Sequence, residues 1–195
     1  MKRLALGLSL AASMAFSTGA FAADSYKFDP SHSQILFSYN HLGFSTTYGL
    51  FSGFNGEAVI DADDLSKSSV KLEMKASDMI TGWQPRTDHF MSGDFFNAAE
   101  NPVVTFVSTK VEPTGEKTAT ITGDLTMAGQ TKEVVLEATL NQIAEHPMEK
   151  KPWAGFDATT TLKRSDFGVD KFAPYVSDDV EIRISVEMEK TGEAS

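Results

Sequence analysis

The feature that most constrains the fold of this chain is a two-residue alternation of apolar and polar side chains. The run "DVEIRISVEMEK" (179–190) shows it over its whole length, and "SVKLEMKA" (69–76) shows it again. In the first run the apolar residues are Val180, Ile182, Ile184, Val186 and Met188. Successive side chains of a β-strand point to opposite faces, so each run predicts a strand with one buried and one wet face. Repetition of such runs predicts an all-β protein.

Eight runs of this kind follow one another along the chain. They cover residues 33–41, 48–61, 69–76, 102–112, 117–127, 132–143, 156–164 and 179–190. The loops "EPTGEK" and "MAGQT" between them are short and contain Gly, which is typical of hairpins and favours antiparallel neighbours. Eight amphipathic antiparallel strands can close into a barrel, which removes exposed edges, or pack as a two-sheet sandwich.

One connection, residues 77–102, is too long for a hairpin. Pro85 suits the first turn of a short helix, and Asp94 is placed to cap a second helix over "FFNAAE" that ends before Pro102. The segment carries Trp83, Phe90, Phe95 and Phe96, which are too many rings for an exposed loop. We therefore expect short helices that cover one end of the barrel or a ligand.

The stretch "HLGFSTTYGLFSGFNGEAVID" (41–61) combines large rings with glycines. Alternation places Phe54, Gly56, Ala58 and Ile60 on the inner face. Small inward residues recur at Ala76, Ala119, Gly123, Ala138 and Ala158. Such a face does not easily fill a barrel, which favours an internal ligand space. The alternative is a filled barrel in which the glycines serve bulges and sharp coiling.

The first 22 residues have the pattern of a secretory signal peptide. "MKR" is a basic start, an apolar run follows, and small residues at Ala20 and Ala22 predict cleavage after Ala22. The alternative, a membrane anchor, would need about 20 apolar residues. We expect residues 23–195 to form one exported domain, located in the bacterial periplasm, with no stable membrane insertion.

Composition narrows the classes of partner and chemistry. The chain has no Cys, so disulfides, Cys-ligated zinc and iron–sulfur sites are excluded. Loss of the signal segment, which carries Lys2 and Arg3 and no acid, lowers the formal net charge from −10 to −12. Phosphate backbones repel such a chain, so nucleic acid is not an expected partner. Strong charge also serves solubility.

No catalytic or metal-binding motif stands out. The four histidines, His32, His41, His89 and His146, have no His-x-x-x-His spacing, and no Gly-x-Ser-x-Gly, P-loop or dinucleotide fingerprint occurs. We expect no catalytic residue, no metal and no cofactor. His41 shares a strand face with Phe37 and Tyr39, where it would meet a polar head group at a barrel mouth; the alternative is a strand-end His bonded to a loop carbonyl.

Two charged clusters have structural interpretations. Arg86 and Asp88 are expected to pair with loop groups, although with His89 they could instead meet a ligand head or hold a lid. Arg164 and Asp166 in "KRSDFG" are expected to form an ion pair around a bend that Gly168 closes, with Phe167 filling one end.

Four motifs in order resemble those of a known family. They are "FDPSHSQILFSYNHLGFSTTYGLFSGFNGEAVID", "TDHFMSGDFFNAAENPVVTFVST", "GDLTMAGQTKEVVL" and "RSDFGV" with "VSDDVEIRISVE". The chain resembles the YceI-like proteins, which are periplasmic, bind polyisoprenoids and have a lipocalin-like barrel. One departure is that Arg86 stands two residues before Asp88 and not directly before it.

The resemblance implies an eight-stranded antiparallel lipocalin-like barrel that holds a long-chain isoprenoid lipid or quinone tail. Met74, Met79, Met91, Met127 and Met188 suit a flexible tail, or serve as core filler. The candidate ligand-binding residues are Phe37, Tyr39, His41, Phe54, Ala58, Leu72, Met74, Trp83, His89, Phe90, Phe95, Phe106, Leu125 and Met127.

Three functions remain open at this point. The first is a non-catalytic binding protein for transport, storage or stress response. The second is an enzyme that acts on an isoprenoid-like substrate through His41, Tyr39 or His89. The third is a stress-responsive structural protein with an incidental lipid. A homodimer is compatible with each of them.

Overall fold

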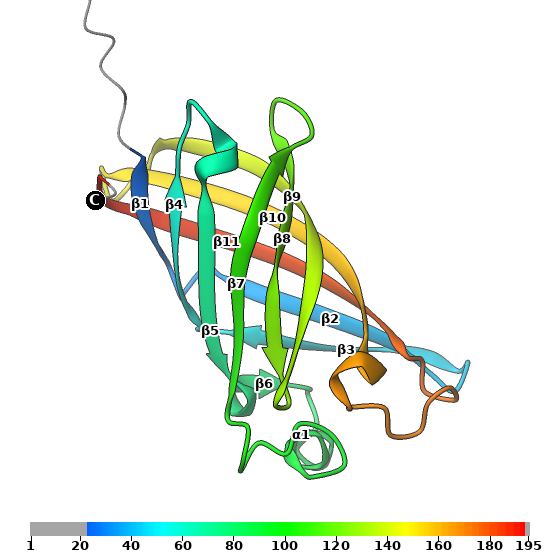
Figure 1. Cartoon of the computed structure of the whole chain (residues 1–195). Coiled ribbons are helices and arrows are strands. Elements are labelled where there is room, and N and C mark those ends of the chain that lie inside the picture. Colours follow the sequence, from blue (N-terminus) through cyan, green and yellow to red (C-terminus); the bar gives the residue numbers. More distant parts are fainter. Residues whose placement is uncertain (1–22, 194–195) are drawn as a thin grey trace, which may run out of the picture.

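The computed structural model describes residues 23–193 (Figure 1). The predicted signal peptide lies outside this range. The strands are β1 (Asp24–Phe28), β2 (Gln34–His41), β3 (Ser45–Ser52), β4 (Asn55–Ile60), β5 (Ser69–Lys75), β6 (Met79–Ile80), β7 (Val103–Pro113), β8 (Thr118–Met127), β9 (Gln130–Glu145), β10 (Pro152–Lys163) and β11 (Asp179–Glu193). The helix α1 spans Gln84–Met91. No helix in the described part of the chain is long and apolar enough to cross a bilayer.

These strands form one closed antiparallel barrel with eight positions. β1 pairs with both β4 and β11, which closes the ring. β11 is long enough to pair with β1 at residues 188–193 and with β2 at residues 181–185, so β1 and β2 share one barrel position. β3 and β4 share the next position. The predicted barrel is confirmed, and the sandwich alternative is wrong.

Two strand predictions needed correction. The single strand expected over 48–61 is two strands, β3 and β4, because Gly53 adopts a positive φ of 75° and the chain bends there. The sequence reading also missed β1, whose alternation is short but visible, since Tyr26 and Phe28 are buried. The short Gly-containing hairpin loop predicted between β8 and β9 is present as a two-residue turn, in which Ala128 and Gly129 both have positive φ.

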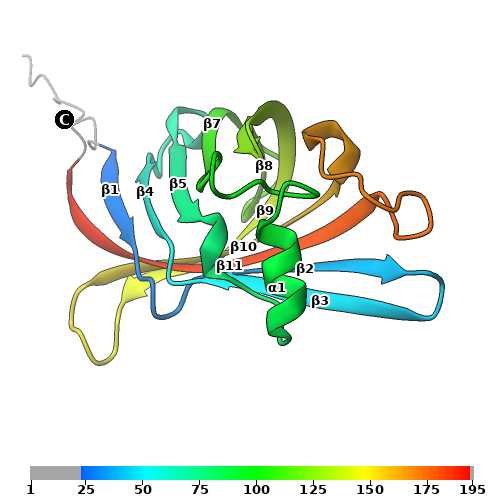
Figure 2. The ribbon, with the colours of Figure 1, turned by 90° about the horizontal axis from the view of Figure 1, so that it is seen from below.

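The barrel wall has a seam beside β3. β6 pairs with β3 only at Leu50 and Phe51, so among the described strands residues 45–49 of β3 pair with β2 alone. The segment that contains α1 lies across this part of the barrel (Figure 2). Side chains of this segment, and not strand pairing, therefore close the barrel at this end.

Only the first of the two expected helices is present in the described residues. Pro85 lies in the first turn of α1, as predicted. Residues 94–99 form turns instead of a second helix, and Asn97 has a positive φ of 44°. The N–H groups of Phe96 and Ala98 donate back to carbonyls of Phe90 and Met91 at the end of α1. These turns therefore cap the end of α1.

Candidate ligand cavity

The barrel encloses a cavity of about 620 Å³, here called the main cavity, at the end where the seam lies. Strands β2, β5, β7, β8, β9 and β11 supply its apolar wall, and α1 with the following turns roofs it. Twelve of the fourteen predicted residues line it: Phe37, Tyr39, His41, Leu72, Met74, Trp83, His89, Phe90, Phe95, Phe106, Leu125 and Met127. Eight of them lie on strands and come together because each strand turns one face inward, whereas Trp83, His89, Phe90 and Phe95 come from the segment that contains α1.

The other two predicted residues lie elsewhere. Phe54 is 2% exposed and packs edge-to-face on Phe28, with ring centroids 6.0 Å apart, so it belongs to the filled core. Ala58 faces a second cavity of about 250 Å³ toward the opposite end of the barrel. Of the methionines considered for a flexible tail, Met74, Met79 and Met127 line the main cavity and Met188 lines the second. Met91 lines neither.

The two cavities meet at a narrow set of side chains. Leu72, Phe106, Leu136 and Ile184 line both of them. These residues come from β5, β7, β9 and β11, and three of them are less than 9% exposed. The barrel interior is therefore divided into two apolar compartments by residues on four different strands.

The inward glycines do not contribute empty space directly. A Cβ built on Gly49 would lie 2.3 Å from the Phe37 ring, and one on Gly123 would lie 2.5 Å from the Phe106 ring. Gly56 has the same relation to Phe28, at 2.4 Å. The expectation that Gly56 and Gly123 leave room for a ligand is wrong, because phenyl rings of neighbouring strands occupy that room. The glycines instead let these rings lie close against the wall.

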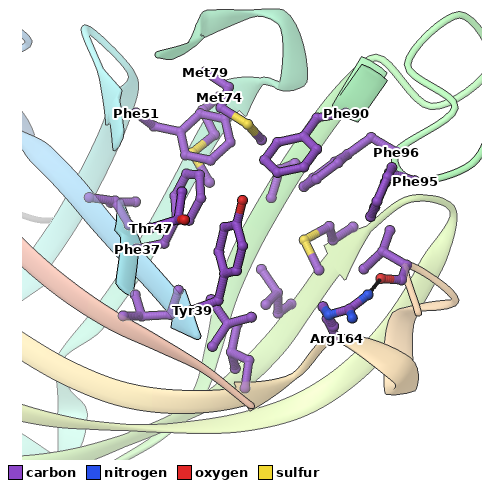
Figure 3. Close-up of a pocket in the computed structure, with 18 of the residues that line it drawn as sticks. Phe37, Tyr39, Thr47, Phe51, Met74, Met79, Phe90, Phe95, Phe96 and Arg164 are labelled. Atoms are coloured by element: carbon purple, nitrogen blue, oxygen red, sulfur yellow. Dashed lines mark hydrogen bonds between the residues drawn. The ribbon is translucent and has the colours of Figure 1, made fainter. Parts of the chain in front are cut away.

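The roof of the main cavity is a cluster of aromatic rings on residues 84–101, which we call the lid. The Phe90 ring lies 5.1 Å from Phe95 and 6.3 Å from Tyr39, measured between centroids. Phe96 also lines the cavity (Figure 3). The structure thus places the predicted rings over the cavity, while their function as a gate remains a prediction.

A salt bridge connects the lid to the loop of residues 169–177. The Asp94 carboxylate accepts hydrogen bonds from His89 Nε2 and Lys171 Nζ, each over 3.1 Å. The bond from His89 and then the bond from Lys171 lower the pKa of Asp94, and burial opposes them weakly. Asp94 therefore ties the lid to the opposite side of the mouth and does not cap a helix as expected.

Arg164 is a feature of the site whose environment the sequence did not predict. Its side chain reaches the cavity wall and is 8% exposed, and its guanidinium donates to the backbone carbonyls of Ser177, Val169, Lys171 and Val176. Burial lowers its pKa, while Asp178 and Asp170 act in the opposite direction. The expected ion pair with Asp166 is wrong, because the carbonyls satisfy the guanidinium.

Arg164 holds the 169–177 loop in place through these four bonds. Gly168, with a φ of 71°, closes the preceding bend as predicted, and Phe167 is buried there. Only proximity in the fold could reveal this role, since an Arg before a turn is equally compatible with a surface ion pair.

The interior carries few polar groups, and Tyr39 is the most central of them. Figure 3 shows its ring standing in the main cavity with the hydroxyl directed into the space near Phe90. His41 lies further out, where its backbone bridges to Val176. Among the polar groups that line the cavity, the Tyr39 phenol, the His41 imidazole and the Thr47 hydroxyl can hydrogen-bond a polar head group.

Arg86 pairs with a loop carbonyl as the structural interpretation predicts, but its side chain also lines the main cavity, and Asp88 pairs within α1 and not with a loop group. Arg86 donates to the carbonyl of Thr81 over 3.2 Å, and its guanidinium lies 5.9 Å from the Trp83 ring centroid. Asp88 accepts a hydrogen bond from Gln84 over 2.7 Å. Both side chains stabilise the start of α1.

A second polar cluster lies at the turn between β1 and β2. Asp29, His32 and Glu187 place potential ligand atoms within 4.8 Å of one another. His32 Nδ1 is 2.6 Å from the Asp29 carboxylate, and this hydrogen bond raises the pKa of His32. Burial acts to raise the pKa of Asp29, but bonds from His32 and Ser31 outweigh it and lower that pKa. No spacing of residues along the chain signals this cluster, because Glu187 comes from the distant strand β11.

Comparison with known proteins identifies the family. The YceI-like domain matches residues 26–188, which is most of the chain. The chain belongs to the YceI-like family. A UPF0312 protein of Pseudomonas savastanoi is 37% identical over 193 residues, covering 96% of this chain and 97% of the relative. A UPF0312 protein of Ectopseudomonas mendocina is 41% identical over 174 residues, covering 86% and 88%.

Solved structures of YceI-like barrels share the fold. The YceI protein of Campylobacter jejuni has a TM-score of 0.71 and 29% identity, covering 78% of this chain and 90% of its own. BcnA of Burkholderia cenocepacia has a TM-score of 0.74 and 24% identity, covering 82% and 98%. A polyisoprenoid binding domain from Saccharophagus degradans has a TM-score of 0.66 and 13% identity, covering 85% and 98%. Because the last two structures are less than 25% identical to this chain, they support the fold alone.

Proposed function

We propose that this protein binds one long isoprenoid chain, such as a polyprenyl lipid or a quinone tail, inside the barrel. The observation that carries the proposal is the main cavity, an apolar space enclosed by a closed barrel and roofed by aromatic rings. Exposure of an isoprenoid chain to water costs about 0.8 kcal/mol of free energy for each CH₂, and burial in such a cavity removes that cost.

The size of the cavity agrees with a chain-like ligand. A water molecule takes about 30 Å³ in the liquid, and a hydrocarbon carbon needs similar room, so about 620 Å³ holds roughly 20 carbons. That corresponds to about four five-carbon isoprene units. The second cavity of about 250 Å³ would add roughly eight carbons if a tail passed the four side chains that line both cavities.

The polar groups favour one orientation of the ligand. The apolar tail would lie against Met74, Met127 and the rings of the wall, while a polar head group would lie near Tyr39 and His41 toward the mouth. The three methionines of the main cavity adapt to an irregular chain. This orientation buries the hydrocarbon and leaves the head group within reach of solvent.

We place this function in the periplasm, as transport or storage of the lipid, and assign no reaction to it. The predicted signal peptide and membership of the YceI-like family support the location. A solved neighbour is described as a polyisoprenoid binding domain, which agrees with the class of ligand. The quinone and the polyprenyl lipid differ only in the head group and share the tail that the cavity would bind.

The proposal is tested by extracting the exported protein with organic solvent and weighing the extract by mass spectrometry. We expect one isoprenoid lipid per chain, with the same mass before and after prolonged incubation with the protein. An extract without lipid, from protein that also fails to take up a polyprenol or a quinone in vitro, would contradict binding. A lipid whose mass changes on incubation, with the change lost in His41→Ala, would instead support the enzyme.

A further inference from the structure

Exposed apolar side chains gather around the mouth of the main cavity. Leu42 and Phe44 lie on the turn between β2 and β3, Phe172 and Tyr175 lie on the 169–177 loop, and Trp83 precedes α1. We call these five residues the mouth patch. The N–H of Leu42 donates to the carbonyl of Tyr175 over 3.1 Å, so the hairpin and the loop are in contact. Figure 1 shows the two side by side at one end of the barrel.

The mouth patch is continuous with the cavity. Trp83 and Phe172 belong to both, since they are exposed on the surface and also line the main cavity. Phe44 and Tyr175 are 89% and 77% exposed and do not line it. A ligand that leaves the cavity on this side would therefore pass directly along exposed rings.

Few of the chain's 27 acidic residues lie in these segments, and the 169–177 loop carries one of them, Asp170, beside Lys171. Residues 34–56, which include the hairpin, contain no Asp, Glu, Lys or Arg. Residues 79–87 contain Arg86 as their only charge, and residues 171–176 contain Lys171. These segments thus carry little net charge in a chain whose formal net charge is −12 after loss of the signal segment, so a zwitterionic lipid surface would repel them weakly.

We propose that the mouth patch docks on the surface of a phospholipid bilayer, so that the main cavity opens directly onto the lipid. This inference rests on the proposed function, because an isoprenoid ligand is poorly soluble in water and resides in bilayers. Trp and Tyr are the residues that favour the membrane–water interface, where an apolar ring meets lipid and its polar edge meets water. Docking is peripheral and reversible, with no spanning segment.

The bilayer fits this surface better than a second copy of the chain. The patch surrounds the opening of an apolar cavity, and a protein partner seated on it would block the only use that we assign to that opening. The exposed rings also sit on two separate loops beside the mouth, which can each insert into a soft surface. A second copy remains an outcome that the experiment detects.

The two tryptophans provide an internal test. Trp83 lies in the mouth patch, whereas Trp153 lies on β10 at the opposite end of the barrel, where it bonds Glu187. The W153F variant therefore reports on the mouth, and W83F reports on the far end. With vesicles of phosphatidylcholine, we expect the emission of W153F to shift to shorter wavelength and that of W83F to remain constant.

Matched substitutions test the patch itself. Phe44→Ser combined with Tyr175→Ser removes two exposed rings outside the cavity lining, and Met148→Ser removes an equally exposed apolar side chain, 81% exposed, on the β9–β10 loop. Burial of a large apolar side chain in lipid should strengthen partition at least tenfold, which corresponds to about 1.4 kcal/mol. In vesicle sedimentation, we expect at least a tenfold weaker partition for the double variant and no change for Met148→Ser.

Three results would overturn the inference. In the first, the wild-type protein fails to sediment with vesicles. In the second, Met148→Ser weakens vesicle partition as much as the double variant does. In the third, the wild-type protein does not bind vesicles but forms a dimer, and the double variant is monomeric. The last result would assign the patch to a second copy. Lipid content after extraction separates this inference from the proposed function. Protein that carries lipid but does not bind vesicles would contradict docking alone. Protein that carries no lipid would contradict the proposed function.

Discussion

The barrel interior differs between its two ends. Toward the mouth, the main cavity has about 620 Å³, and the lid closes the barrel where β3 lacks a second pairing partner in the described structure. Toward the other end, β1 and β4 complete the ring of paired strands, and Tyr26, Phe28 and Phe54 are almost fully buried. The second cavity there has about 250 Å³.

This difference shows that residue type alone does not decide whether a barrel is hollow. Phe28 lies on Gly56 and packs against Phe54, so rings occupy much of the interior at the end away from the mouth, and the cavity that Phe28 also lines there is the smaller one. Phe37 lies on Gly49 in a similar way, yet it forms the wall of the main cavity. Near the mouth, the lid and the 169–177 loop cover the barrel interior, and the larger cavity lies beneath their side chains.

The largest expected effect comes from removing Arg164, which organises the mouth. Arg164→Met leaves four backbone carbonyls without their donor, and hydrogen bonds to a charged group contribute about 1.5–3 kcal/mol each, without simple additivity. We expect a loss of about 3 kcal/mol or more in the free energy of unfolding, measured by urea denaturation. Hydrogen exchange should increase first in residues 169–177.

Arg183→Met is the matched control, because Arg183 is exposed on β11. It should change the free energy of unfolding by less than about 0.5 kcal/mol. Similar losses in both variants would mean that the mouth does not depend on the buried guanidinium.

The next effect concerns the packing of a ring on a glycine. In Gly49→Ala the three atoms nearest to the new Cβ would all belong to the Phe37 ring, which must shift to make room. Overpacking of this kind typically costs about 1–3 kcal/mol. We expect a lower thermal midpoint together with weaker uptake of a polyprenol. Gly192→Ala, where a Cβ meets nothing within 4 Å, should change neither quantity.

If Gly49→Ala lowers the thermal midpoint but leaves polyprenol uptake unchanged, the proposed difference between the two ends of the barrel is contradicted. It would mean that Phe37 does not bound the space that the ligand uses. The ring would then be core packing in both halves of the barrel.

The lid should control the rate of release and not the fold. Replacing Phe95 and Phe96 with Ser removes two rings that line the cavity, and an apolar ring in contact with the ligand contributes at least about 1.4 kcal/mol, which is tenfold in rate. We expect lipid release, followed by transfer to acceptor vesicles, to be at least tenfold faster. Met148→Ser serves as the control. Unchanged release from a folded double variant would show that these rings are not a gate.

The smallest change in stability is expected at the end away from the mouth. Ala58→Phe places a ring toward the second cavity, so the thermal midpoint of the lipid-free protein should hold or rise slightly. Filling this cavity should leave binding in the main cavity intact and exclude only the end of a longer tail. A clear loss of stability with unchanged binding of the longest chains would mean that Ala58 faces packed core.

Local sequence pattern was sufficient for most of the barrel. The alternation on β5, β8, β9 and β11 predicted which side chains face inward, and twelve of fourteen candidate residues line the main cavity. Alternation is a property of neighbouring residues, so one strand suffices to read it. It failed at Phe54 and Ala58 because it distinguishes inside from outside but does not give the height of a residue along the barrel axis.

The remaining features depend on contacts between distant segments. Arg164 meets carbonyls of the 169–177 loop, and Gly49 receives the Phe37 ring from the adjacent strand. Neither relation follows from the spacing of residues in the sequence. The bend at Gly53 that separates β3 from β4 was missed because an isolated Gly in an alternating run equally fits a bulge within one strand.

The most direct test of ligand binding in the main cavity is NMR of protein labelled with ¹³C at the methionine methyl groups. Met74, Met79 and Met127 line the main cavity, Met188 lines the second cavity, and Met148 is exposed on the far loop. On addition of a polyprenol of about four isoprene units, we expect shifts and intermolecular NOEs at the first three methyl groups and none at Met148. Longer chains should reach Met188 as well. Shifts confined to Met148, or the absence of any shift at Met74, Met79 and Met127 under saturating polyprenol, would contradict the account.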